Sequence, residues 1–473
     1  MFIAFRATSR DAHEGGRQLN RWTGSWEGSI ERLVTVGKRL EFKRLRVLEA
    51  RVRAVYKKSM KTVSPLIAVC AVAVAACATP AKETSAKTPV WQVSPGLPTY
   101  YINSVATSGD GNKVIGGTFF HSYGTTSRFE GMRDRSTASS SDGTFGTYCY
   151  DQTGKQLWKD EFTGFEGVYW VDLSTDGAYA ASGGWFSGSP NYAGFVRAYD
   201  ASNGTRLLNY ATTSRVNEVD LTADGSWLVS AAETLVLFKR VNGVFTKTGE
   251  FTPAGTDNMI VTAAISADGD TIVCADYSGN IILFKNKGGL PVVFQQWKMP
   301  SGSSHCVRIT PDGAAFAAGG SQGNFYLFDT AAFIATGRPA ITSQISSQAA
   351  VYGVAIADDG SAFVGISNLT SGSTDGGLVY FVKRTSTTGA PAWTYQTKRN
   401  PNCASLNLSK GLLAVADGHP DGTPGDFYLF NTADGSLRWQ YTTTNMSWPI
   451  MISAQGNAVV SGSDDSAIYY FTP

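Results

Sequence analysis

Eight copies of a short strand-rich unit predict an all-β chain that folds as one eight-bladed β-propeller of four-stranded antiparallel blades. The first observation is a turn, most often Ser/Thr-x-Asp-Gly, that recurs between two apolar runs. Its glycines, mostly 44 to 51 residues apart, are Gly111, Gly177, Gly225, Gly269, Gly313, Gly360, Gly411 and Gly456. The second is composition: 51 glycines, 12% aromatic and only 16% charged residues suit many short strands around a large apolar core.

The unit around Gly269 shows the pattern of one blade. Strand-like runs at residues 260–266 and 271–275 flank the Asp-Gly turn, and a third run at 281–284 follows a Ser-Gly-Asn connector. Asp-Gly between such runs predicts a hairpin, because glycine adopts positive φ without steric cost. A fourth run often carries a tryptophan, as at Trp158, Trp297, Trp393 and Trp439. Four strands in ~45 residues are typical of a propeller blade, and nearly continuous apolar runs favour sheets covered on both faces over a sandwich.

The two ends of the propeller region, residues 90–473, complement each other. The eighth unit has three strand-like runs, at 449–453, 458–460 and 468–471. Val-Trp-Gln-Val-Ser-Pro at 90–95 is similar to the fourth-strand segment Arg-Trp-Gln-Tyr-Thr-Thr at 438–443. We therefore expect the N-terminal segment to supply the fourth strand of the last blade and close the ring, so that no edge between first and last blades stays unpaired. Seven blades would leave one unit unused.

Residues 60–76 have the form of a signal peptide. Met60-Lys61 is followed by an apolar stretch too short to span a bilayer, which needs ~20 residues, and then by small residues. Val-Ala-Ala-Cys at 74–77 resembles the bacterial lipobox, which implies that Cys77 becomes the lipid-modified N-terminus. Two acyl chains give stable anchoring, whereas one is marginal. Ala78, where an Asp would signal inner-membrane retention, favours the outer membrane. The alternative is an ordinary signal peptide in which Cys77 is incidental.

Two segments flank this signal. Residues 1–59 include a basic run, 32–58, that could form an amphipathic helix. Because Met60-Lys61 is already a complete signal start, we interpret 1–59 as a non-native upstream extension; a cytoplasmic tail for nucleic acid or a membrane surface is the alternative. Residues 77–89 are small and polar, which predicts a flexible tether.

The charge is unevenly distributed along the chain. Residues 1–76 hold 15 Lys and Arg against 6 Asp and Glu, which leaves 25 basic against 32 acidic residues and a net charge near −7 from Cys77 onward. An acidic body is poorly suited to phosphate-backbone binding. We therefore expect no nucleic-acid partner.

Several turns resemble known repeat families. Tyr-Asp-Gln-Thr-Gly-Lys-Gln-Leu-Trp at 150–158 and Phe-Asn-Thr-Ala-Asp-Gly-Ser-Leu-Arg-Trp at 430–439 resemble the tryptophan motif of PQQ-like propellers, and 199–204 is a weaker copy. Tyr-Leu-Phe-Asp at 326–329 is similar to WD-repeat blades. With the lipobox, the chain resembles a PQQ-like or WD-repeat-like propeller lipoprotein of bacteria. The resemblance implies the fold, whereas function depends on individual sites.

No motif in the body indicates catalysis. Quinoprotein dehydrogenases are similar in blade count, but they carry adjacent cysteines beside the cofactor and a calcium held by Glu, Asn and Asp. The body cysteines Cys149, Cys274, Cys306 and Cys403 are far apart, and we expect buried free thiols, with a Cys274–Cys306 disulfide as the alternative. The body histidines His121, His305 and His419 have no metal-ligand spacing. We expect no enzyme activity, cofactor or metal; the alternative is a PQQ-dependent quinoprotein-type oxidoreductase.

One acidic loop could offer oxygen ligands to calcium. Asp417, Asp421 and Asp426 lie in a Gly- and Pro-rich segment. The segment lacks EF-hand spacing and a closing bidentate Glu. We interpret it as a surface turn.

The longest insertions predict the binding face. In a propeller, the loops between the second and third strands and those between blades lie on one face. Long loops occur there at 119–146, 185–192, 367–376 and 417–426, all on one arc of the ring. Loops on a rigid scaffold commonly form binding sites. The residues expected to approach the axis on that face are Asn103, Tyr169, Trp170, Asn217, Glu218, His305, Tyr352 and Trp448. The candidate partner-binding residues among them are Tyr169, Trp170, Asn217, His305, Tyr352 and Trp448. Aromatic and polar groups together suit a protein or glycan partner, so we expect an envelope lipoprotein that serves as a binding scaffold.

Overall fold

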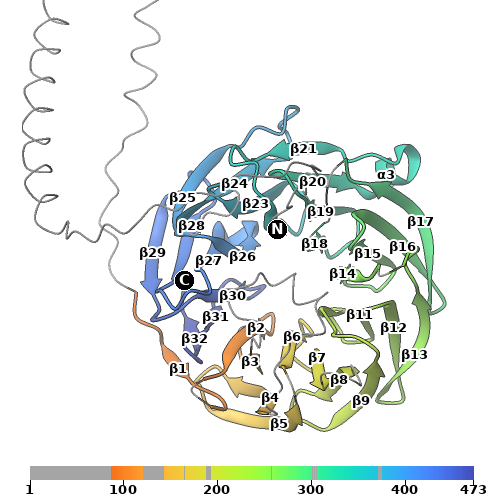
Figure 1. Cartoon of the computed structure of the whole chain (residues 1–473), viewed down its shortest axis with the longest axis vertical. Helices are drawn as coiled ribbons and strands as arrows, with labels where there is room; N and C mark the ends of the chain where they lie inside the picture. Colours follow the sequence, from red (N-terminus) through yellow and green to blue (C-terminus); the bar gives the residue numbers. More distant parts are fainter. Residues whose placement is uncertain are drawn as a thin grey trace, which may run out of the picture. The chain divides into compact units, whose positions relative to one another are not determined.

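The strands form a closed ring of four-stranded antiparallel blades (Figure 1). The sheets of the first two blades are joined into one through a single pair, Phe119 with Gly167. The computed structural model describes residues 87–97, 99–120, 143–164, 166–187, 193–256, 258–300, 302, 304, 306–370 and 375–473. The predicted eight-bladed propeller is confirmed.

Each blade runs from an innermost strand at the axis to an outermost strand at the rim. Blade one comprises β2 (Tyr101–Thr107), β3 (Lys113–Phe119), β4 (Gly143–Asp151) and β5 (Gln156–Gly164), and blade two comprises β6 (Gly167–Leu173), β7 (Tyr179–Ser187), β8 (Ala193–Asp200) and β9 (Arg206–Thr212). Blade three comprises β10 (Glu218–Leu221), β11 (Trp227–Ala231), β12 (Leu235–Val241) and β13 (Val244–Phe251), and blade four comprises β14 (Ile260–Ile265), β15 (Thr271–Asp276), β16 (Asn280–Lys287) and β17 (Leu290–Lys298). Blade five comprises β18 (Cys306–Ile309), β19 (Ala315–Gly319), β20 (Asn324–Asp329) and β21 (Ile341–Gln344), and blade six comprises β22 (Val351–Ile356), β23 (Ala362–Asn368), β24 (Asp375–Lys383) and β25 (Trp393–Arg399). Blade seven comprises β26 (Pro401–Asn407), β27 (Leu412–Asp417), β28 (Asp426–Asn431) and β29 (Leu437–Thr442), and blade eight comprises β30 (Ser447–Ile452), β31 (Val459–Ser463), β32 (Ile468–Phe471) and β1 (Trp91–Val93).

The ring closes through the N-terminal strand, as predicted. Strand β1 pairs antiparallel with β32, with Trp91 opposite Tyr470 and Val93 opposite Ile468. In Figure 1 the orange β1 lies beside the blue β32. The Trp91 ring stacks on Tyr470 at 5.2 Å between centroids, and its Nε1 donates to the Gln152 carbonyl oxygen of blade one at 2.9 Å. Trp91 therefore joins the last blade to the first.

The repeated Asp-Gly turn follows from a hydrogen-bonding pattern. In blade four, the Ser266 hydroxyl donates to the Asp268 carboxylate at 2.6 Å, and that carboxylate accepts the amide of Asp270 at 3.0 Å. Gly269 has a φ of 75°, a conformation that glycine adopts without strain. The turn also touches the next blade, because the Ala267 amide donates to the Pro311 carbonyl at 2.8 Å. The motif thus shapes each hairpin and links neighbouring blades.

The core consists of layers between adjacent blades rather than one central mass. The described residues form eight apolar clusters, one at each blade interface. The cluster that closes the ring contains Val114 and Tyr150 of blade one with Val460 and Ile468 of blade eight. Each blade buries both faces, which explains the nearly continuous apolar runs.

One short α-helix interrupts the repeat in blade five. Helix α3 (Thr330–Thr336) follows β20, where the other blades have a short turn. Asp329 caps it by accepting the Ala332 amide at 2.9 Å, and Gly337 ends it with a φ of 67°. Phe333 anchors the helix in the core between blades four and five. A short 3₁₀ turn, η1 (Leu408–Lys410), precedes β27.

The predicted extension (1–59), signal peptide (60–76) and Cys77 lie outside the described residues, as does all of the tether before residue 87. In the part of the chain that the structure describes, no helix is long and apolar enough to cross a membrane.

Candidate functional site

The innermost strands begin at one end of the propeller, here named the entrance face. Because the strands of a blade alternate in direction, the loops between second and third strands and those between blades lie at this same end. Most innermost strands carry a β-bulge near their start. The extra residue is Asn103 in β2, Tyr169 in β6, Val261 in β14, Tyr352 in β22 and Asn402 in β26, and in β30 the bulge falls at residues 448–449. A bulge changes the direction of the side chains beside it. The bulges therefore set which side chains point toward the axis.

A central cavity of about 390 Å³ lies on the axis and is lined by the innermost strands of all eight blades. Five of the six predicted partner-binding residues line it: Tyr169, Trp170, Asn217, Tyr352 and Trp448. The sixth, His305, lies outside the described residues. Trp170, Tyr352 and Trp448, on blades two, six and eight, are partly exposed.

For Tyr169 and Asn217, the expectation of an exposed, partner-facing side chain is wrong. Tyr169 is only 1% exposed, and the Arg215 guanidinium covers its ring at 4.1 Å. Asn217 is 3% exposed and donates from Nδ2 to the Ile260 carbonyl at 3.0 Å. Both side chains are buried in the interface between two blades, where they support the wall of the cavity.

Polar side chains along the cavity join several blades to their neighbours. Asn103 donates to the Tyr169 carbonyl at 2.7 Å, and Asn402 donates to the Ser447 carbonyl at 2.8 Å. These bonds run from one innermost strand to its neighbour, so they hold the ring at its narrowest radius. Much of the polar lining is therefore structural.

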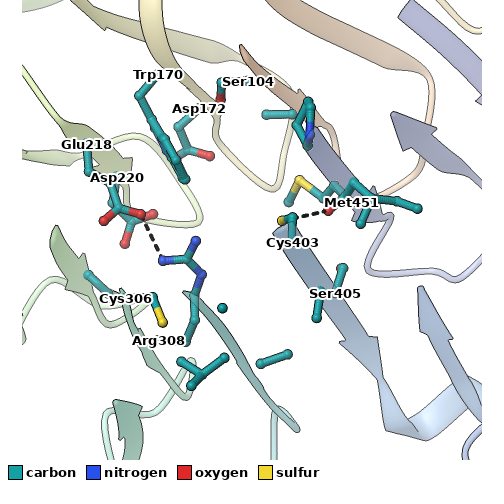
Figure 2. A pocket seen from close by; sticks show the side chains of 18 of the residues that line it. Ser104, Trp170, Asp172, Glu218, Asp220, Cys306, Arg308, Cys403, Ser405 and Met451 are labelled. Atoms are coloured by element: carbon teal, nitrogen blue, oxygen red, sulfur yellow. Dashed lines mark hydrogen bonds and ion pairs between the residues drawn. The ribbon is translucent and has the colours of Figure 1, made fainter. Parts of the chain in front are cut away.

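One wall of the cavity is charged. Asp172 on β6, Glu218 and Asp220 on β10 and Arg308 on β18 line it. Arg308 donates to Glu218 Oε1 at 2.8 Å and to the Val307 carbonyl at 2.7 Å, and its guanidinium carbon lies 5.7 Å from the centre of the Trp170 ring. Figure 2 shows Arg308 reaching toward Glu218 and Asp220.

The facing wall is small and weakly polar. Figure 2 places Cys403, Ser405 and Met451 across the cavity from the charged group. The Ser405 hydroxyl accepts the Ile452 amide at 3.0 Å. The cavity therefore has one acidic and one nearly neutral side.

Burial changes the ionisation of the acidic wall. It raises the pKa of Asp172 to about 6, and the neighbouring Glu218 carboxylate adds to the shift, while the Leu221 and Leu173 amides and Arg308 oppose it. Burial, then the charge of Asp172, also holds the pKa of Asp220 well above its usual value. Each carboxyl is enclosed by protein and partly exposed only toward the cavity. A raised carboxyl pKa marks a position where negative charge lacks compensation.

The acidic segment of blade seven forms the connection between β27 and β28, but only part of it is a surface turn, because Asp417 and Asp426 are buried strand ends. Asp417 and Asp426 are buried within the blade: Asp417 accepts the Tyr428 hydroxyl at 2.8 Å and the Asp426 amide at 2.7 Å. Gln440 donates to Asp426 at 2.5 Å. Among the described residues, no group of three or more His, Cys, Asp or Glu side chains is placed to share a metal ion.

The four body cysteines are free thiols on separate blades. The Cys274–Cys306 disulfide is absent, and burial raises the pKa of Cys306 to about 12. The adjacent pair that the quinoprotein resemblance would require is not formed by these four.

The structure describes only part of the long loops that we predicted on the binding face. Residues 121–142, 188–192 and 371–374 lie outside the described residues. In blade seven, the loop between β27 and β28 is described and stands on the entrance face.

No protein-family model and no curated protein matches the chain. Among solved structures, Sqt1 from Chaetomium thermophilum matches with a TM-score of 0.61 and 12% identity, over 82% of this chain and 98% of that chain. The same protein bound to the N-terminus of the ribosomal protein L10 matches with a TM-score of 0.60 and 12% identity, over 82% of this chain and 100% of that chain. At this identity the likeness shows the fold alone.

Proposed function

We propose that this protein is a cell-envelope lipoprotein whose propeller binds a protein partner, or a glycan, on the entrance face. The observation that carries the proposal is the set of partly exposed aromatic rings, Trp170, Tyr352 and Trp448, that three separate blades bring to one cavity. Rings on a rigid scaffold give apolar contact area with little loss of side-chain entropy and are enriched in interface hot spots.

The solved complex supports the choice of a protein partner. In it, a propeller of similar fold is bound to the N-terminus of a protein. An extended chain end is narrow enough to approach an axial cavity of about 390 Å³, which is within the range of about 300–1,000 Å³ for ligand pockets.

The envelope setting rests on the N-terminal sequence. Residues 60–76 fit a lipoprotein signal, Cys77 the acylated residue and the following polar residues a tether. The alanine at 78 supports outer-membrane sorting, and residues 1–59 are the upstream extension.

Capture from solubilised cell envelope tests the binding role. We expect the immobilised wild-type protein to retain one specific protein, and Trp448→Ala to reduce its apparent affinity about tenfold or more, as for a hot spot of ~2 kcal/mol. Trp227→Ala is the matched control: Trp227 begins β11 beside an Asp-Gly turn, at the opposite end of the propeller. Equal capture by wild type and Trp448→Ala, or loss only with Trp227→Ala, would contradict the proposal. A visible absorption spectrum of the purified protein tests the quinoprotein alternative.

A further inference from the structure

The cavity wall holds more negative than positive side chains. Asp172, Glu218 and Asp220 face it from two adjacent blades, and Arg308 is the cation beside them. Arg308 already bonds to Glu218 and to the Val307 carbonyl. One guanidinium therefore lies beside three carboxyl groups, and it forms a direct ion pair with only one of them, Glu218.

Two acceptors at the cavity lack donors among the described residues. Asp220 accepts one hydrogen bond, from the Ile265 amide to Oδ2 at 2.8 Å, so its second oxygen receives none. Asn103, which is 3% exposed, has its Nδ2 committed to the Tyr169 carbonyl, and its Oδ1 has no partner. A buried acceptor without a donor, such as Asn103 Oδ1, is costly and is usually satisfied by water or a ligand. The second Asp220 oxygen differs, because Asp220 is partly exposed and lines the cavity, where a ligand can reach it. These two, on blades three and one, are independent of each other.

We propose that the cavity receives a positively charged side chain, lysine or arginine, from the partner, with its N–H groups bound to Asp220 and Asp172 next to the Trp170 ring. This inference rests on the proposed function and names the feature of the partner that the site selects. A guanidinium or ammonium group supplies both the charge and the donors that the cavity lacks. The Trp170 indole adds a cation–π surface, already near the Arg308 guanidinium at 5.7 Å.

Other ligand classes fit the cavity less well. An anion would meet three carboxyl groups, and Arg308 is already engaged by Glu218. A metal ion would need a shared ligand set, and the described residues form none. A neutral apolar side chain would leave the second Asp220 oxygen without a donor.

The bound cation should also make recognition depend on pH. Asp172 has a pKa raised to about 6, because it is buried beside Glu218. Below that value it is mostly protonated and attracts a cation weakly; above it the carboxylate is charged. Glu218, Asp220 and Arg308 are the other charged groups facing it. Affinity for a peptide whose cation is Lys or Arg should therefore rise between pH 5 and pH 7.5. A peptide whose cation is histidine would show the opposite trend, because histidine loses its positive charge as the pH rises.

Selection from a displayed library of random heptapeptides, with the full-length protein as bait, tests the inference. We expect one peptide position to be enriched about tenfold in Lys or Arg, and the enrichment to fall below about twofold with Asp220→Asn, since charge-assisted bonds are replaced by neutral ones. Asn keeps an acceptor for the Ile265 amide. Asp358→Asn is the matched control, because Asp358 also lines the cavity but comes from the turn that follows β22. A selected peptide with its arginine replaced by neutral, isosteric citrulline should bind about tenfold more weakly or worse.

The outcomes separate this inference from the proposed function. Peptides that bind through Trp448 without any enriched basic position would overturn the inference and leave the binding role intact. Enrichment that survives in both Asp220→Asn and Asp172→Asn, each shown by thermal melting to be folded, would also overturn it. If no peptide is selected at all, both proposals fail for peptide partners.

Discussion

Deletion of residues 89–98 should cause the largest loss of thermal stability of any short deletion in the propeller. It removes strand β1, its pairing with β32 and the Trp91 ring that packs between Tyr470 and Tyr150. It also removes Val93 from the apolar cluster that closes the ring. Loss of one large aromatic side chain from a core costs about 3–5 kcal/mol, less for a partly exposed ring, and the lost strand adds its hydrogen bonds to this cost.

Calorimetry of matched variants measures this effect. Deletion of residues 79–86, which precede the strand, should leave the melting temperature unchanged, and Trp91→Ala should lie between this control and the strand deletion. Trp91→Ala removes the bond to the Gln152 carbonyl as well as the ring contact. An unchanged melting temperature after deletion of 89–98 would mean that the ring does not depend on β1.

The Cys77→Ser substitution should move the protein completely from the membrane fraction to the soluble envelope fraction. Stable anchoring needs two hydrophobic signals, and in this account both acyl chains depend on the one thiol. Fractionation followed by immunoblotting measures the distribution. Expression from Met60 is the matched control, because it retains residues 60–77 and should give the same membrane-bound product as the full sequence. Membrane retention of Cys77→Ser would contradict the lipoprotein assignment.

The repeat made the fold predictable. The Asp-Gly period, the Trp-bearing fourth strands and the similarity of residues 90–95 to 438–443 were enough to predict eight blades and their closure. Each of these signals is local or periodic. Helix α3 could not be predicted in this way, because it replaces a turn in one blade and depends on the capping residues Asp329 and Gly337.

Glu218 of the acidic wall was expected near the axis, whereas Asp172, Asp220 and Arg308 were missed, although the sequence carries a signal for them. Val-Asp-Leu occurs at 171–173 and again at 219–221, each time four residues before the turn glycine, and Val-Arg-Ile occupies the equivalent positions at 307–309. A charged residue inside an otherwise apolar innermost strand points to the axis. The residues come together only when the ring closes, so their shared charge could not be read from one repeat. Burial of Tyr169 depends in the same way on Arg215, which reaches it from the next blade.

Site-specific photo-crosslinking shows whether the partner binds the entrance face. A photoreactive amino acid in place of Tyr352, which is partly exposed at the cavity, should crosslink the protein captured from the envelope. The same group in place of Trp227, at the opposite end, should give no such product. We expect a partner adduct from position 352 alone; an adduct from position 227 alone would show that the partner binds the other face.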